Sequence, residues 1–318
     1  MNGSYIFLSV ILTLLFIMIF GGYIIFLVVS KRRTERPNTF EGMFNNTSRD
    51  ENTLIRLKRD YEWFDENRSE DISILSNDGL RLSATLLSAK TEEPKGVIVM
   101  MHGYRSASRR DLCLQMRILH EAGYHLIVAD QRSHVRSEGK YICYGIKERE
   151  DAMLWRAKAA ELFGKDLPTA LMGLSMGGAT VLMASGLADK NDTSLRCIVA
   201  DCPFSSPWDI VREVMLHTYK LYHIPMLYII NFWCKAIAKF SLRETSAERS
   251  VSSSHLPVLI IHGDADTFVS CKHSERVAAA CPDRVRLVKI SRANHAEAIF
   301  YDEELYKKEL FSFLEQHM

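Results

Sequence analysis

Residues 171–178 read Leu-Met-Gly-Leu-Ser-Met-Gly-Gly and contain the pattern Gly173-x-Ser175-x-Gly177. An apolar run precedes this serine, and small residues at helical spacing follow it. Strand, turn and helix in this order are the setting in which Gly-x-Ser-x-Gly forms a nucleophile elbow. Glycine at positions 173 and 177 lets the backbone approach closely on both sides. The stretch therefore predicts a nucleophilic Ser175 facing the N-terminus of a helix; the alternative is an idle serine in a glycine-rich turn.

Around this stretch, apolar runs of strand length alternate with amphipathic helical patterns. A hairpin opens the series, with Asn77-Asp78-Gly79 as its turn, and the later strands are apolar throughout, as buried parallel strands are. This order predicts an α/β fold with a mostly parallel, doubly wound sheet. We expect strands at 72–75, 80–87, 96–101, 124–130, 169–174, 195–200, 257–261 and 285–290, and helices at 111–121, 147–163, 176–188, 274–280 and 302–314.

A serine hydroxyl is a weak nucleophile and needs a base, a group that orients the base, and donors for the oxyanion. Asp266 lies in the loop that follows one apolar strand, and His295 lies between the last strand and the last helix. We therefore predict Ser175, His295 and Asp266 as nucleophile, base and orienting acid. The backbone N–H groups of Met176 and Tyr104 are the predicted oxyanion hole.

From about residue 71 to 314 the chain resembles the α/β-hydrolase fold superfamily, most closely the lidded serine hydrolases described as lysophospholipase-like or serine-aminopeptidase-like. The order Ser175, Asp266, His295 is the order of that superfamily. Its acid stands three residues after a glycine, which matches Asp266 rather than Asp264, the alternative acid. The resemblance implies acyl transfer through a Ser-His-Asp triad. The residues that carry it are His102-Gly103, Asp130-Gln131-Arg132-Ser133-His134, Gly173 to Gly178, Gly263 to Val269, and His295.

The chain also departs from the pattern of these relatives. After the fourth strand they often have D-x-R-G-H-G-x-S, whereas Ser133 and Val135 replace the two glycines here. Ala293-Asn294 stands before His295, where glycine is common. The first departure leaves the shape of that turn and its contribution to the pocket open.

Other polar residues carry weaker signals. His134 and His125 are more often structural than catalytic in such positions. A group of arginines near the predicted oxyanion loop either attracts an acidic substrate group or forms a solvated basic face, which is the commoner arrangement. These are Arg105, Arg109 and Arg110.

One segment, from about residue 206 to 255, interrupts the alternation of strands and helices. It shows helical spacing and no strand pattern, and residues 226–240 are nearly all apolar. Such an insert either packs as ordinary helices on the sheet or forms a lid over the nucleophile. We expect the lid, because binding loops of open α/β sheets lie at this edge.

The N-terminus carries an uncharged apolar run, Tyr5 to Val29, long enough to cross a bilayer. It lacks the basic start and small-residue cleavage site of a signal peptide. Basic residues follow it, so the positive-inside rule places the rest of the chain in the cytoplasm. We predict a single-pass anchor at 1–33, a linker at 34–70 and a catalytic domain at 71–318. The flanking basic residues are Lys31, Arg32, Arg33 and Arg36.

Composition limits the class of protein and the kinds of partner it can have. The 318 residues are 47% hydrophobic and 25% charged, with a formal net charge of +1, which is typical of a globular protein and argues against a nucleic-acid partner. The cysteine count is odd, and no Cys/His spacing suggests zinc, which favours free thiols in a reducing compartment. No cofactor or metal motif is present. The cysteines are Cys113, Cys143, Cys197, Cys202, Cys234, Cys271 and Cys281.

Together these features predict a membrane-anchored serine hydrolase. Its expected substrate is a small carboxylic ester or thioester with an apolar acyl group, and its expected partner is the lipid bilayer. A serine peptidase of the same fold and a catalytically silent, tethered binding protein are the alternatives. The sequence does not predict the oligomeric state.

Overall fold

The computed structural model describes residues 3–33, 40, 51–219 and 225–318. Residues 34–39 and 41–50 of the expected linker, and 220–224 of the expected lid, lie outside this part of the chain. The contacts reported below are those of the described residues.

The described residues form one mixed sheet of eight strands in the order β1-β2-β4-β3-β5-β6-β7-β8. β1, β2 and β4 pair antiparallel, and every pairing from β4 to β8 is parallel. This confirms the predicted α/β fold, and each expected strand is present. The strands are β1 (Glu70–Leu75), β2 (Arg81–Leu87), β3 (Gly96–Met101), β4 (Tyr124–Ala129), β5 (Thr169–Leu174), β6 (Leu195–Asp201), β7 (Val258–Gly263) and β8 (Val285–Ile290).

Helices cover both faces of the sheet because the side chains of each central strand alternate between two apolar layers. Ile98 and Met100 of β3 face the first layer, whereas Val97 and Val99 face the second. All four are fully buried, and each such side chain stabilises the fold by about 1.5–3 kcal/mol. The first layer is built by α3 (Glu51–Asn67), α5 (Cys113–Glu121) and α13 (Glu303–His317), and the second by α6 (Glu148–Phe163), α7 (Met176–Ser185), α10 (Ala247–Ser253) and α11 (Lys272–Ala280).

Part of the range expected to be a linker is helical and belongs to the domain. α3 buries Leu57, Tyr61 and Phe64 in the first layer, where it packs against α5. Arg109 of α4 (Ser108–Asp111) donates to the Tyr61 carbonyl at 2.8 Å. The described domain therefore begins at α3, about twenty residues before the first strand.

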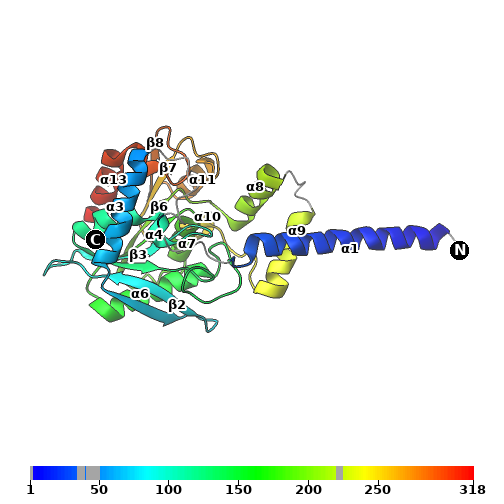
Figure 1. Ribbon diagram of the computed structural model, residues 1–318, viewed down its shortest axis with the longest axis horizontal. Helices are drawn as coiled ribbons and strands as arrows, with labels where there is room; N and C mark the ends of the chain where they lie inside the picture. Colours follow the sequence, from blue (N-terminus) through cyan, green and yellow to red (C-terminus); the bar gives the residue numbers. More distant parts are fainter. Residues whose placement is uncertain (1–2, 34–39, 41–50, 220–224) are drawn as a thin grey trace.

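The insert between β6 and β7 consists of helices joined by loops, with no strand among its described residues. It comprises α8 (Pro207–Tyr219), α9 (Met226–Trp233), a π-helical turn (Cys234–Ala238) and α10. α10 packs against α7 and α11, so it is part of the second layer. α8 and α9 extend away from the sheet toward the N-terminal helix (Figure 1). The insert thus combines a helix packed on the sheet with two helices that stand apart from it.

The N-terminal helix, α1 (Gly3–Ser30), projects far from the domain for most of its length (Figure 1). It is long and apolar enough to cross a membrane. Near its C-terminal end it packs against α9, with Gly22 facing Ile229 and Met226. Phe26 is fully buried among side chains of the domain.

The end of α1 is held by residues that are distant in sequence. The last four carbonyls of a helix have no partner within it. Here the Val29 carbonyl accepts from the hydroxyls of Tyr104 and Tyr144, the latter at 2.8 Å, and the Val28 carbonyl accepts from Arg105. We call this contact, residues 26–32 with the loops at 104–105 and 133–144, the α1 dock. It also includes Ile142 N to Ser30 O, Arg32 N to Lys140 O, and the Arg32 guanidinium on the carbonyls of Val135 and Ser137.

Candidate active site

Ser175 stands at the sharp turn between β5 and α7. Its φ of 56° and ψ of −114° are unusual for a residue with a side chain. Its N–H donates to the Asp201 carbonyl at 2.8 Å, which fixes the turn to β6. A Cβ at position 177 would lie 2.0 Å from the Met101 carbonyl oxygen, and one at 173 would lie 2.2 Å from the backbone of Gly177. Only glycine fits at 173 and 177, so the elbow depends on both.

The structure brings the three predicted catalytic side chains together. His295 Nε2 lies 2.9 Å from Ser175 Oγ, and His295 Nδ1 lies 2.7 Å from Asp266 Oδ2. His295 comes from the loop between β8 and α12 (Ala298–Tyr301), and Asp266 from the loop after β7. The side chains predicted as nucleophile, base and orienting acid therefore form a continuous line of hydrogen-bonding contacts.

The carboxylate of Asp266 has a partner on every side. Its Oδ1 accepts the N–H groups of Phe268 at 2.9 Å and Val269 at 2.8 Å. Its Oδ2 lies 3.2 Å from His262 Nε2, in addition to the contact with His295. Burial by itself raises the pKa of Asp266, but the hydrogen bonds from the two histidines and from the backbone outweigh it and hold the pKa well below the usual range. Asp266 is therefore ionised at neutral pH, as the orienting acid must be.

His262 is a residue of this site that the sequence reasoning did not single out. It is fully buried, its Nδ1 lies 2.6 Å from Ser274 Oγ of α11, and its Nε2 lies 2.9 Å from the Val269 carbonyl as well as near Asp266. It thus ties the loop that carries Asp266 to the end of β7 and to α11. Its place directly before Gly263, in the same motif as the acid, was the available signal.

The predicted oxyanion donors lie at the ends of β3 and β5. Met176 is the first residue of α7, where a backbone N–H has no partner within the helix. Tyr104 follows Gly103, whose own N–H is engaged by Asp111 Oδ2 at 2.8 Å. A Cβ at Gly103 would lie 3.6 Å from Ser175 Cβ, so this loop passes close beside the nucleophile. Both donors therefore come from backbone that borders Ser175.

The histidines that follow β3 and β4 support this loop. His134 Nε2 accepts the N–H of Arg105 at 3.0 Å, and the His102 ring lies edge-on to the His134 ring. Burial lowers the pKa of His134 to about 3 and that of His102 to about 4, so both are neutral acceptors at pH 7. His125 lies elsewhere and accepts the N–H of Ala89 at 3.0 Å.

Asp264 and two of the arginines have structural partners. Asp264 Oδ1 accepts the N–H of Arg292 at 2.6 Å, whereas the carboxylate in contact with His295 is that of Asp266. Arg109 binds α3 through the Tyr61 carbonyl, and Arg105 binds the end of α1. These contacts favour a structural role for both arginines over attraction of a substrate.

The turn after β4 keeps the backbone shape for which its relatives use glycine. Ser133 has a φ of 63° and Val135 a φ of 41°. Positive φ is rare outside glycine and strained for a β-branched residue. The Val135 carbonyl accepts from Arg32 at 2.6 Å, so this strained turn lies within the α1 dock.

A second serine, histidine and carboxylate are linked in the same manner. Ser205 Oγ lies 2.8 Å from His273 Nδ1, and His273 Nε2 lies 2.9 Å from Glu213 Oε2. Ser205 is fully buried, and this series of hydrogen bonds joins α8 to α11. It therefore has the form of a structural link. Nothing in the local sequence of Ser205 resembles an elbow.

Among the described residues, one group of possible metal ligands includes the triad. Cys202, Asp266 and His295 offer ligand atoms within 4.8 Å of one another. Both oxygens of Asp266 already accept hydrogen bonds, so an ion bound there would compete with the contact between His295 and Asp266.

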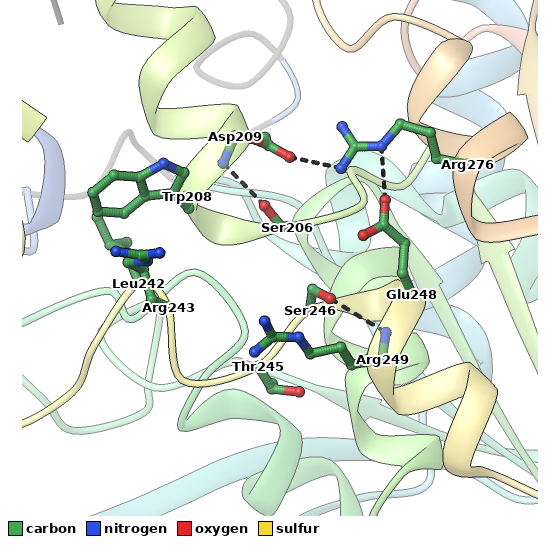
Figure 2. Close-up of a pocket in the computed structure, with 10 residues that line it drawn as sticks. All are labelled: Ser206, Trp208, Asp209, Leu242, Arg243, Thr245, Ser246, Glu248, Arg249 and Arg276. Carbon is green, nitrogen blue, oxygen red and sulfur yellow. Dashed lines mark hydrogen bonds and ion pairs between the residues drawn. The ribbon is translucent and has the colours of Figure 1, made fainter. Parts of the chain in front are cut away.

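A polar hollow of about 200 Å³ lies beneath α8 and α10, and none of its lining residues belongs to the triad (Figure 2). Arg276 crosses it and binds Asp209 at 2.8 Å and Glu248 at 2.7 Å. Arg243 lies over the ring of Trp208 at 5.0 Å. Much of its charge is thus paired internally, and the hollow serves mainly to join α8, α10 and α11.

Comparisons with known proteins agree with this fold. Residues 78–225 match the family described as X-Pro dipeptidyl-peptidase (S15 family). The chain is 25% identical over 221 residues to the uncharacterized protein YqkD of Bacillus subtilis (strain 168), covering 69% of this chain and 70% of that protein. It is 27% identical over 175 residues to the lysophosphatidylserine lipase ABHD12 of Danio rerio, covering 54% of this chain and 44% of the lipase.

Among solved structures, the esterase Pf2001 of Pyrococcus furiosus is similar with a TM-score of 0.60 at 22% sequence identity. The similarity covers 78% of this chain and 91% of the esterase. At this level of identity the likeness concerns the fold, and it extends over nearly the whole of the smaller protein.

Proposed function

Since the chain belongs to the α/β-hydrolase fold superfamily, we propose that it is a serine hydrolase that cleaves carboxylic ester or thioester bonds with Ser175 as nucleophile. The observation that carries the proposal is the position of His295, within 2.9 Å of Ser175 Oγ and 2.7 Å of Asp266 Oδ2. A serine with a base and an ionised orienting acid at these distances is equipped for acyl transfer. The fold alone does not imply this chemistry.

The proposed reaction proceeds in two steps. In the first, Ser175 Oγ attacks the acyl carbon while His295 takes its proton and passes it to the leaving group. In the second, water attacks the acyl carbon while His295 takes its proton. His295 then returns this proton to Ser175 Oγ as the acyl–oxygen bond breaks and the acid is released. Asp266 holds the imidazole with Nδ1–H directed at the carboxylate and stabilises the imidazolium. The N–H groups of Met176 and Tyr104 stabilise the oxyanion in both steps.

We further propose that α1 is an uncleaved single-pass anchor, with the catalytic domain in the cytoplasm. Phe26 is buried in the domain and the last carbonyls of α1 accept hydrogen bonds from it, so removal of α1 as a signal sequence would open the core. The basic flank at Lys31 and Arg32 supports the cytoplasmic side. All seven cysteines are free and buried, which suits a reducing compartment. An apolar acyl substrate fits this setting.

A fluorophosphonate probe tests the nucleophile directly. We expect one labelled serine, and we expect Ser175→Ala to abolish both labelling and ester hydrolysis. Ser205→Ala is the matched control, because Ser205 also contacts a histidine that contacts a carboxylate but is fully buried. Labelling that survives Ser175→Ala would contradict the proposal, and absence of any labelling of the folded protein would favour the catalytically silent binding protein.

The match to the X-Pro dipeptidyl-peptidase family supports one second candidate, a serine peptidase that uses the same triad. A substrate panel separates the two. We expect turnover of p-nitrophenyl esters and acyl thioesters to exceed that of X-Pro p-nitroanilides. The reverse order would assign peptidase activity, and Ser175→Ala should abolish either.

Protease protection tests the sidedness of the domain. Intact cells or spheroplasts are treated with protease from outside, and the C-terminus is followed with an antibody. We expect the C-terminal domain to survive until the membrane is permeabilised. Digestion from outside would overturn the cytoplasmic placement.

A further inference from the structure

We propose that α9 lies in the membrane interface beside α1, so that the lid region draws its acyl substrate from the bilayer. The proposal rests on the membrane span proposed above for α1. It assigns a lipid surface as the partner of α9 and makes the substrate a bilayer-resident ester. Four observations on the described residues support it.

The first observation is direct packing between the two helices. The Trp233 indole N–H donates to the Ile19 carbonyl at 3.1 Å, and the Tyr23 ring lies 5.1 Å from the Trp233 ring. A Cβ at Gly22 would lie 2.4 Å from Ile229, so the backbone of α1 approaches α9 closely. Small residues permit such close helix contacts in membranes. The position of α9 is therefore tied to that of α1.

The second observation is the length of α1. The part before Ile19 is about 24 Å long at 1.5 Å per residue, whereas the hydrocarbon core of a bilayer is about 30 Å thick. The free part alone is thus too short to cross. A crossing made by the described residues of α1 therefore also includes the turns that contact α9, which brings the start of that contact to the boundary between hydrocarbon and headgroups. Tilting of α1 would bring α9 deeper.

The third observation is the outer surface of α9. Tyr228 is 52% exposed and Phe232 is 56% exposed, in a helix whose other side is buried against the domain. Trp233 is half-buried beside them. Aromatic side chains of this kind concentrate at the headgroup level of membranes. Water-exposed rings on a lid helix are unfavourable, but contact with lipid would stabilise them.

The fourth observation is charge. The described segment from residue 225 to 243 contains no acidic residue. Lys235 on the π-helical turn and Lys239 directly after it are both exposed. Arg243 lies over Trp208 and within 5.9 Å of the Tyr228 ring, which Figure 2 shows for Arg243 and Trp208. Basic groups near an anionic leaflet favour membrane binding. The basic rim and aromatic face together match an anionic lipid surface.

A depth measurement on the full chain tests the proposal without any assay of activity. Variants that each add one exposed cysteine are spin-labelled and reconstituted in phosphatidylcholine vesicles with phosphatidylglycerol. They are Phe232→Cys, Leu12→Cys and Leu75→Cys. The native cysteines are all buried, so the label goes to the new site. Collisions with oxygen report lipid, and collisions with a water-soluble nickel chelate report water.

We expect a deep label at Leu12, an interfacial label at Phe232 and an aqueous label at Leu75, which is 70% exposed on β1. A Phe232 label in water with a deep Leu12 label would overturn the inference and leave the anchor intact. A Leu12 label in water would overturn the anchor itself. Dipolar coupling between Phe232 labels of different molecules would show that a second copy covers α9, which also contradicts the proposal.

Activity provides a second test, as the ratio of turnover on a vesicle-embedded long-chain ester to turnover on a water-soluble short-chain ester. For the pair Tyr228→Asp and Phe232→Asp we expect this ratio to fall about tenfold, because two charges replace interfacial rings. Leu75→Asp, the matched control on β1, should leave it unchanged. An unchanged ratio in the double variant would contradict the proposal, whereas a uniform loss on both substrates would mean that α9 acts on the fold rather than on access to lipid.

Discussion

Two regions of the molecule border the loop at Tyr104 and are built differently. One is formed by the carboxyl ends of β5, β7 and β8, and the other is the α1 dock. At the strand ends, short polar contacts converge on one serine, and every partner of Asp266 is accounted for. At the dock, a long apolar helix ends in carbonyls that accept from side chains about 75 to 115 residues away. In the function proposed above, the first region supplies the chemistry, and the second holds that chemistry close to the membrane.

The largest effect belongs to the strand ends. Ser175→Ala should reduce kcat by about 10⁴ to 10⁶, since the nucleophile is lost and only binding and the oxyanion hole remain. Steady-state kinetics on a water-soluble ester, with circular dichroism to verify folding, measures it. Turnover within tenfold of the native protein would show that the region at β5 is not where the chemistry lies.

The identity of the acid gives the next effect. Asp266→Asn should reduce kcat by about 10⁴, because the amide no longer holds His295 in the productive tautomer. Asp264→Asn is the matched control and should cost far less, since Asp264 faces the N–H of Arg292. If the two variants exchange magnitudes, the acid has been assigned to the wrong carboxylate.

These two predictions were accessible from sequence because the elbow and the acid loop are local motifs. Gly173, Ser175 and Gly177 lie within five residues, and the acid follows a recognisable strand. Even the unexpected His262 lies within four residues of Asp266. The α1 dock had no such signal. It joins residues 26–32 to 104–105 and 133–144, and no short pattern encodes contacts across that separation.

The same contrast between local motifs and long-range contacts explains where the structure differs from the predictions outside the site. The range 34–70 is polar and was expected to be a linker, whereas the packing of α3 against α5 makes part of it belong to the domain. Likewise, the apolar insert was recognised as helical, whereas the division between α10 on the sheet and α9 on α1 depends on tertiary contacts. Ser133 and Val135 show the reverse case, because the backbone keeps its turn although the residues do not favour it.

A buried carboxyl beneath the triad should make stability depend on pH. Burial raises the pKa of Asp201 to about 6, and its Oδ1 has no hydrogen-bond partner among the described residues. The folded state thus favours the protonated form, so this contribution is fully present below about pH 4 and is lost as the pH rises through 6. The loss is about 3 kcal/mol.

Asp201→Asn should remove the decline above pH 6 and leave the rise in stability between pH 4 and 6.5 that the lowered pKa values of His102 and His134 produce. Denaturant unfolding of the protein in detergent across that range measures the effect. A native profile that already shows no decline above pH 6, or an Asp201→Asn profile that keeps the decline, would exclude Asp201 as its source.

At the dock, the hydroxyls of Tyr104 and Tyr144 connect α1 to the oxyanion loop. Replacing both by phenylalanine leaves the backbone donor at Tyr104 in place but frees the loop, so we expect kcat on a water-soluble ester to fall about tenfold, with KM nearly unchanged. The rate of fluorophosphonate labelling should fall in parallel. Tyr301→Phe, at an exposed tyrosine, is the control. Lower thermal stability with native kcat would show that the dock has no part in positioning the loop.

The smallest effect concerns backbone strain in the loop whose carbonyls accept hydrogen bonds from Arg32. Val135→Gly relieves a φ of 41°, and after the entropy that glycine adds to the unfolded chain it should stabilise the protein by about 1 kcal/mol. A rise in the thermal midpoint with unchanged kcat would show that strain at the α1 dock affects stability without affecting the chemistry at the strand ends. A fall would mean that contacts of the Val135 side chain outweigh the strain.

The capped end of α1 also dictates an order of events during synthesis. Residues 26–32 leave the ribosome early, but Tyr104, Arg105 and Tyr144 follow only after about 75 to 115 further residues, which at 5–20 residues per second takes roughly 4 to 23 s. During that interval the apolar helix has no partner in the domain, so it is available for insertion into the bilayer first. The hydrolase domain would then complete its core against a helix already in the membrane, and a pulse-chase protease assay should find resistance of the domain only after insertion of α1. With the anchor proposed above, completion of the loop at Tyr104 would be coupled to insertion of α1 into the membrane.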